Sequence, residues 1–496
     1  MFRKVTLALV LAAFLASCAT DRGGVDTPPE PIDATAALTA ASTAMKADGV
    51  NSIMLSGTAW NARNGFMQMP SASPPWTLRD EMKNYVQTVD PTRPAFRATA
   101  DTFASDIFFH EPMAGMYSLN ANGDSGWAQQ MEIWLTPWGF LRGAAANAAE
   151  GVSQTVNGTR YSVVTWKSPV TSPGGPAYTL TGYINSDNLV ERVETRVEHP
   201  LAGDLLVANV YSDYQDLGGV MVPTTIEQQR AGGALFGVHV ANAVANPENV
   251  AELVTPPPPA GGGGARGGRG GGGRGSAGGQ AQSSEQLGPG VYLIKTPYQS
   301  LAVEFQDYVA VFEGGASAAV GQQVIDQVKG LFPGKEIRYV INSHPHSDHA
   351  GGLVPFIREG ITVLTHENNV EFLKMIFSTP RTLLGEETSN PKIEGVGEMR
   401  VLEDSTNRLE LHHIPNGHTD GMLLAYHPGT GVVMQADFTL TTPENPFVVE
   451  LAERVDQLGL KFSKYYGVHA AARPETQQDL VQAAATSKAA IAARKK

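Results

Sequence analysis

The chain has 496 residues, of which 42% are hydrophobic, a length and composition suited to two or three domains with ordinary cores. Acidic residues outnumber basic ones by 49 to 36, giving a net charge of −13 that argues against a nucleic-acid binder relying on phosphate neutralisation. Only one apolar run approaches membrane length, at the N-terminus, which excludes a polytopic membrane protein. A single cysteine excludes an intramolecular disulfide and a cysteine-ligated zinc ribbon.

The N-terminus has the pattern of an export signal. Arg3 and Lys4 precede a short apolar run, and small residues lead to Cys18. This segment resembles the lipobox of bacterial lipoproteins, although an ordinary signal peptide with a chance cysteine is the alternative. The resemblance implies a signal peptide over residues 1–18, lipidation of Cys18 and a membrane anchor. Because no aspartate follows the cysteine, it implies the outer membrane, facing the periplasm. The proline-rich residues 19–32 predict an extended tether.

Residues 33–250 predict a mainly antiparallel β domain. Asp33 is the expected N-cap of a helix that ends near Lys46, and a second helix is expected over residues 138–149. Alternating apolar residues predict strands over residues 51–60, 85–88, 95–104, 131–135, 161–166, 178–184, 206–214 and 221–229. Strands in hairpin order favour an antiparallel sheet or a partial barrel. Residues 211–223 resemble the closing strands of half-barrels like the outer-membrane lipoprotein carriers.

The sequence of this N-terminal half shows no recognisable set of catalytic residues. His110, His199 and His239 are scattered without ligand spacing, so we expect surface or core roles for them. Residues 251–286, a proline run followed by a glycine–arginine segment, predict a flexible linker. The alternative is an arginine–glycine contact with nucleic acid or an anionic surface, which three arginines in an acidic, exported protein do not favour. Few contacts are expected to cross the linker, so we expect two separately folded pieces.

The chemistry is concentrated in residues 287–496, where nine of the twelve histidines lie. An apolar run ends directly in His344, His346, Asp348 and His349, and two glycines and a helix-like run over residues 353–357 follow. A loop at the carboxyl end of a strand can aim such side chains into one cleft. Imidazole nitrogens and carboxylate oxygens suit zinc and similar divalent ions. The glycines permit a close approach of the backbone.

This segment resembles the metallo-β-lactamase superfamily, and further motifs around His418, Asp437 and His469 extend the resemblance to the whole domain. It implies an αββα sandwich, and hence an α+β protein overall, with two divalent ions, Zn²⁺ by preference. The implied ligands are His344, His346 and His418 for the first ion and Asp348, His349 and His469 for the second. Asp437 and a water bridge the two ions, and Asp348 is in addition the predicted catalytic residue.

The remaining elements of this domain follow the same resemblance. Strands are expected over residues 291–296, 301–306, 308–312 and 361–365, and helices over residues 316–331 and 368–377. Three residues depart from the usual pattern of the superfamily, and none of them removes a ligand. Glu313 replaces a turn aspartate, where we expect little effect, and Ala436 and Ala470 replace glycines. Structural roles are expected for His366, His412, His413 and His427. Residues 379–390 and 441–446 are the expected walls of the cleft.

The implied activity is hydrolysis of an ester, thioester, lactone or related bond of a small-molecule substrate by a metal-bridging hydroxide. An aspartate at position 437 is more similar to the glyoxalase II, lactonase and phosphodiesterase branches than to β-lactamases, which generally carry cysteine or serine there. β-Lactam hydrolysis and iron-dependent oxidoreduction on the same ligands stay open. A third possibility is a binding protein whose N-terminal half holds a lipid or a partner.

Overall fold

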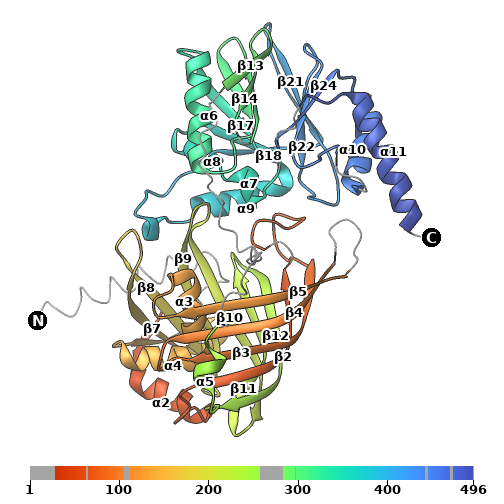
Figure 1. The fold of residues 1–496 in the computed structure, drawn as a ribbon. Helices are drawn as coiled ribbons and strands as arrows, with labels where there is room; N and C mark the ends of the chain where they lie inside the picture. The colour runs from red at the N-terminus through yellow and green to blue at the C-terminus, as the bar shows by residue number, and fades with distance from the viewer. Residues whose placement is uncertain are drawn as a thin grey trace, which may run out of the picture.

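The structure is a computed structural model that describes residues 28–62, 65–105, 112–256, 283–296, 298–441, 445–469 and 473–494. The lipobox with Cys18, His110, Ala470 and the glycine–arginine segment lie outside these residues. The described chain forms a β-rich N-terminal domain and a C-terminal αββα domain, which confirms the α+β class (Figure 1). Within the described ranges, none of the helices has both the length and the apolar character needed to cross a membrane.

The N-terminal domain is a twelve-stranded antiparallel sheet that curls around short helices. Its strands are β1 (Glu30–Ile32), β2 (Ile53–Ala62), β3 (Arg79–Asp90), β4 (Ala95–Ser105), β5 (Pro112–Asn122), β6 (Glu150–Val156), β7 (Thr159–Thr171), β8 (Ala177–Ile184), β9 (Val190–His199), β10 (Gly203–Leu217), β11 (Val220–Arg230) and β12 (Gly233–Ala245). Their order is β1-β6-β7-β8-β9-β10-β11-β12-β2-β3-β4-β5. Helix α3 (Trp127–Trp134) contacts both β9 and the distant β4 and β5, so the sheet must curl around it (Figure 1).

Three further helices belong to this domain: α2 (Ala34–Ala44), α4 (Pro137–Ala146) and the short α5 (Val250–Leu253). Asp33 and Thr136 cap α2 and α4 as side-chain acceptors for backbone N–H groups, which is why both helices start where the sequence predicts. Helix α4 ends before residue 149, since β6 already begins at Glu150.

The strand predicted over residues 131–135 is wrong, because these residues belong to α3 and the turn after it. The buried Trp127, Gln130 and Met131, followed by the half-buried Trp134, recur at helical spacing. A five-residue apolar run cannot by itself distinguish a helix from a strand. Strands β5, β6, β9 and β12 were not predicted. The last residues of the expected tether form β1, which pairs with β6.

The C-terminal domain consists of two facing sheets with helices on both outer sides. The first sheet contains, in order, β13 (Ser283–Gly288), β14 (Val291–Lys295), β15 (Ser300–Glu304), β16 (Tyr308–Phe312), β17 (Glu336–Ile341), β18 (Thr362–His366) and β19 (Ile393–Val396). The second contains β20 (Met399–Glu403), β21 (Arg408–His413), β22 (Leu423–His427), β23 (Val432–Gln435) and β24 (Lys464–Gly467). The helices are α6 (Ala318–Leu331), α7 (Ser347–Ala350), α8 (Leu353–Arg358), α9 (Glu367–Ser378), the 3₁₀ helix η2 (Thr382–Leu384), α10 (Pro446–Gln457) and α11 (Gln477–Arg494).

Alternation along the central strands explains the layers of this domain. On β16, Val309 and Val311 pack with α6 and α8, whereas Ala310 and Phe312 pack against the second sheet. All four side chains are fully buried, as expected for a strand covered on both faces. On β23, Val433 likewise packs toward α10 while its neighbours face the first sheet. The predicted αββα sandwich is therefore confirmed.

A polar clamp joins the two domains, contrary to the expectation that few contacts cross between them. The buried carboxylate of Asp204 on β10 accepts hydrogen bonds from the backbone N–H groups of Thr382 (3.1 Å) and Leu383 (2.9 Å) and from the Thr382 hydroxyl (2.6 Å). In the opposite direction, the buried guanidinium of Arg381 donates to the carbonyls of Leu201 (3.1 Å) and Pro200 (2.7 Å). Buried apolar residues of the two domains also form one continuous core.

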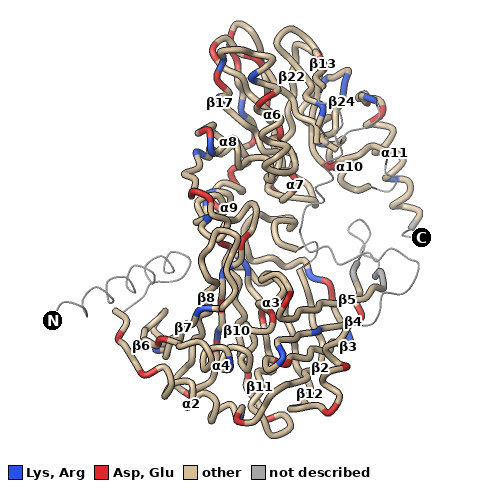
Figure 2. The backbone as a smooth tube through the Cα atoms, turned by 60° about the vertical axis from the view of Figure 1, so that its left-hand side comes forward, with Lys and Arg blue, Asp and Glu red and all other residues tan. Residues whose placement is uncertain are grey.

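Residues 379–390, an expected wall of the cleft, contact the N-terminal domain through η2. In both Figure 1 and Figure 2 helix α9, which leads into this segment, lies at the boundary between the domains. Figure 2 also shows acidic and basic residues interspersed along both domains. The charge of the chain is thus spread over the described surface.

Candidate metal centre

The seven predicted ligand residues come from four segments, each of which follows a strand. His344, His346, Asp348 and His349 lie on the loop after β17 and on α7, and His418 lies between β21 and β22. Asp437 follows β23 and His469 follows β24. The structure brings them together in two groups that share Asp437, and the possible ligand atoms of each group lie within 4.8 Å of one another. Their role as metal ligands remains a prediction.

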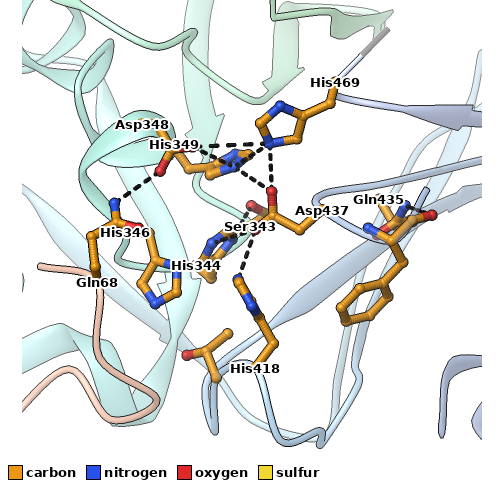
Figure 3. Close-up of polar contacts among 12 residues, drawn as sticks. Gln68, Ser343, His344, His346, Asp348, His349, His418, Gln435, Asp437 and His469 are labelled. Atoms are coloured by element: carbon orange, nitrogen blue, oxygen red, sulfur yellow. Dashed lines mark hydrogen bonds and ion pairs between the residues drawn. The ribbon is translucent and has the colours of Figure 1, made fainter. Parts of the chain in front are cut away.

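The carboxylate of Asp437 lies between the two groups (Figure 3). Its Oδ2 is 2.9 Å from Nε2 of His344 and 2.8 Å from Nε2 of His418. Its Oδ1 is 3.0 Å from Nε2 of His349 and 2.5 Å from Nε2 of His469. Each oxygen therefore faces two histidines of one group, an arrangement that suits a bridging carboxylate.

Neighbouring side chains orient two of these histidines through the ring nitrogen that points away from Asp437. Nδ1 of His344 lies 2.9 Å from the Ser343 hydroxyl, and Nδ1 of His349 lies 3.0 Å from Oε2 of Glu313. The other oxygen of Glu313 accepts the backbone N–H of Ser343 at 2.8 Å. The fully buried Glu313 thus ties the loop after β17 to the histidine of α7, an arrangement common around metal-binding histidines.

Backbone conformations at the centre are unusual for their residue types. Glu313 and Asp437 have φ values of +70° and +63°, in the left-handed region that non-glycine residues seldom adopt. Such conformations persist where surrounding contacts determine them, and they cluster at functional sites. Gly352 permits the close approach predicted from the sequence, since a Cβ atom there would lie 2.0 Å from the carbonyl oxygen of Gly314.

The electrostatic environment leaves His346 neutral and both acids of the centre ionised. Burial, together with neighbouring His418, lowers the pKa of His346 to about 4. Burial would raise the pKa of Asp348, but the charge of His349 and the Gln68 amide bring it to about 2. Burial opposes ionisation of Asp437 too, yet His349 and His344 hold its pKa well below the usual range. Burial would lower the pKa of His349, but Asp437 and Glu313 raise it well above the usual range, so this ring gives up a proton when it binds a metal.

The donor set fits divalent metal ions. The buried Nε2 atoms of His344 and His418 lie 2.9 and 2.8 Å from Oδ2 of Asp437 but lack the alignment of a hydrogen bond with it. The Nε2 atoms of His349 and His469 lie only 3.3 Å apart beside the same carboxylate oxygen. Nitrogen and oxygen donors converging in this way suit zinc and related ions.

Three contacts at the centre were missed by the sequence analysis. The Gln68 amide of the N-terminal domain donates to Oδ1 of Asp348 at 3.1 Å, and the hydroxyl of Tyr298 donates to Oδ2 at 3.1 Å (Figure 3 for Gln68). The carbonyl of Met69 lies 3.0 Å from Nε2 of His346. Gln68 and Met69 belong to the domain without a catalytic motif, and no local pattern marks either residue or Tyr298.

The remaining histidines of the described chain belong to neither group of possible ligands, and all but His239 have side-chain partners. His366 caps α9 and stacks on His413, with ring centroids 3.8 Å apart. His412 contacts Glu410, and His427 contacts Asn407. Nδ1 of His199 accepts backbone N–H groups in the turn after β9, and His239 is exposed.

Comparison with known proteins gives a family match for the C-terminal domain. Residues 297–486 match the sequence model of the metallo-beta-lactamase superfamily. No curated protein matches the chain. Similar solved structures include a metallo-beta-lactamase from Pontibacter korlensis, 14% identical over 42% of this chain and 99% of that one, with a TM-score of 0.34. Another is a sec-alkylsulfatase from Pseudomonas sp., 12% identical over 41% of each chain, with a TM-score of 0.31.

The sequence match and the fold together define the class of the second domain. Residues 297–486 form a metallo-beta-lactamase superfamily domain, as predicted from the motifs around its histidines and aspartates. The β-rich domain before it lies outside the matched residues.

Proposed function

We propose that the protein is a metal-dependent hydrolase with two divalent ions, Zn²⁺ by preference, held by the seven residues of the centre. The observation that carries this proposal is the position of Asp437, whose two carboxylate oxygens each face the histidines of a different group. His344, His346 and His418 would hold one ion and Asp348, His349 and His469 the other. When bound, two such ions activate a water near neutral pH and polarise the bond to be cleaved.

The protein side chains have separate tasks in this proposal. Asp437 fixes the two groups relative to each other, and its ionised form supplies negative charge to both. Asp348 is the more exposed of the two acids, with 37% of its side chain accessible against 14% for Asp437. Its ionised carboxylate is therefore the group available to orient a water and to accept a proton from it.

The proposed substrates are small molecules with an ester, thioester, lactone or related bond. A two-metal centre needs no nucleophilic side chain, which agrees with a sequence that lacks a serine nucleophile elbow and has its single cysteine at position 18. The aspartate at position 437, where β-lactamases generally carry cysteine or serine, favours this substrate class over β-lactams.

Metal analysis and a substrate panel on the purified full-length protein test the proposal. We expect about two zinc ions per chain and turnover of at least one ester, thioester or lactone, abolished by a chelator and restored by Zn²⁺. β-Lactam and phosphodiester substrates complete the panel. Tightly bound iron with redox activity would replace the hydrolase with an oxidoreductase. A chain that binds no divalent ion would remove the proposal altogether.

We also propose that acylated Cys18 anchors the protein to the outer membrane, facing the periplasm. The lipobox-like sequence before this cysteine supports the proposal, and several acyl chains together make a stable anchor. Replacing Cys18→Ser should leave an unprocessed or soluble protein. If the variant partitions into detergent like the wild type and has the same mobility, the anchor is not at Cys18.

A further inference from the structure

A loop of the N-terminal domain reaches the metal centre of the C-terminal domain. The loop connects β2 and β3, and its described part over residues 65–78 passes beside α7. The carbonyl of Met67 accepts the backbone N–H of Ser347 at 2.9 Å, and the carbonyl of Pro70 accepts that of Asp420 at 2.8 Å. These contacts bind the loop to both ligand-bearing segments next to it, the one with His346 and the one with His418.

Two further contacts of this loop involve the ligand side chains themselves. A carbonyl oxygen can only accept, so the contact of the Met69 carbonyl with Nε2 of His346 at 3.0 Å places the ring proton on Nε2. The other nitrogen, Nδ1, is then left with the lone pair that a metal needs. The amide of Gln68 donates to Oδ1 of Asp348 at 3.1 Å and to the hydroxyl of Ser347 at 2.8 Å.

The loop is held firmly enough to serve as a fixed support. Met67, Met69 and Trp76 are buried, and the indole N–H of Trp76 donates to the carbonyl of Ser71 at 3.1 Å. Phe66 and Trp76 both pack edge-on against Phe372 of α9, with ring centroids 6.3 Å away in each case. The loop is therefore packed onto the C-terminal domain as part of its core.

We propose that this loop completes the metal centre and that Gln68 is a positioning residue for Asp348. The inference rests on the proposed function, because it assigns Gln68 to the second of the two proposed ions. Gln68 donates to one oxygen of Asp348 and Tyr298 donates to the other, so the carboxylate has one preferred orientation. Losing an outer contact of this kind typically lowers metal affinity by 10–100-fold. The N-terminal domain thus contributes residues that complete the active site of the proposed hydrolase.

Replacing Gln68→Met in the full-length protein tests the inference, because methionine keeps the length of the side chain and removes the amide donor. Ser73→Ala is the matched control, since Ser73 is an exposed residue of the same loop. Stepwise Zn²⁺ affinities are measured by competition with a chelator, and the absorption spectrum of the Co²⁺-loaded protein reports the geometry of each ion.

We expect Gln68→Met to bind the second ion about 10–100-fold more weakly, with the first ion and the unfolding temperature of the metal-free protein unchanged. The control should match the wild type in every measurement. If the wild type binds two ions and Gln68→Met binds both equally well with the same Co²⁺ spectrum, the inference is wrong and the proposed function stands. Equal weakening of both ions, with a lower unfolding temperature, would show a merely structural role. A wild type that binds no ion overturns both.

Discussion

The two groups of the metal centre differ in burial and in what orients them. His344 is fully buried, His346 is 4% exposed and His418 exposes 22% of its side chain. In the other group His349 is fully buried, whereas Asp348 and His469 expose 37% and 34% of their side chains. In the buried group, which consists of His344, His346 and His418, the adjacent Ser343 and a backbone carbonyl orient two of the rings. The exposed group consists of Asp348, His349 and His469. Its side chains are oriented by Glu313, Gln68 and Tyr298, which come from three separate segments.

This difference predicts that the two proposed ions are held unequally. A backbone carbonyl in a packed loop has little freedom to lose, whereas long side chains such as glutamine must be ordered at an entropic cost. The exposed group also lies nearer to solvent, where charges interact more weakly. We therefore expect the buried group to bind its ion more tightly, and the exposed group to exchange its ion and to meet the substrate.

Replacing Asp437→Asn should have the largest effect, because it removes the carboxylate that both groups share. The amide keeps the size but loses the charge, so we expect the second ion to be lost before the first. Activation by two ions contributes several kcal/mol, so kcat should fall by about 10³-fold or more. Metal stoichiometry and kcat measure the effect, with Asp420→Asn, an exposed acid near His418, as the control. Two tightly held ions with unchanged turnover would contradict the bridging role.

Removing one histidine from each group tests whether the two ions are lost separately. His346→Ala should lose the tightly held ion, and metal content and activity should fall together. His469→Ala should lose only the weakly held ion and retain about one ion per chain, since three possible ligands of the buried group remain beside Asp437. Metal analysis after extensive dialysis distinguishes the two variants. Equal loss from both would mean that the ions bind as one unit.

Glu313→Gln should have a smaller effect, concentrated on the exposed group. The amide retains one oxygen for the Ser343 N–H but loses the carboxylate that faces Nδ1 of His349. A weaker second ion, by about 10–100-fold, is the expected result. Titration with Zn²⁺ in a competing chelator measures it. Unchanged affinities would support the sequence-based expectation that residue 313 matters little.

Tyr298→Phe should have the smallest effect of the series. It removes one hydroxyl donor to Asp348 but keeps the aromatic ring that packs against His349 and His469. A hydrogen bond to a charged group contributes about 1.5–3 kcal/mol, and partial exposure places this one at the lower end, so we expect about a tenfold change in kcat/KM. If Tyr298→Phe lowers kcat/KM more than Glu313→Gln does in the same assay, Tyr298 contacts the substrate.

The sequence predicted the groups of this centre far better than the contacts that orient them. His344, His346, Asp348 and His349 follow one apolar strand within a few residues, so local spacing alone indicates a shared site. Gln68 could not be predicted, because its contact with Asp348 spans 280 positions and depends on how two domains pack. The error at residues 131–135 has a local cause, since a short apolar run carries too little periodicity to reveal its helix.

The clamp between the domains also limits which mutations the chain can accept during evolution. Asp204 binds mainly backbone N–H groups of the other domain, and Arg381 binds backbone carbonyls. These backbone contacts do not depend on the identity of the exposed side chains around η2 and the β9–β10 turn, whereas an inserted or deleted residue in either segment would shift the backbone groups out of reach. Such a change would leave a buried charge without partners, which is strongly destabilising. Substitutions of exposed residues should be tolerated at this boundary, and changes in length should not.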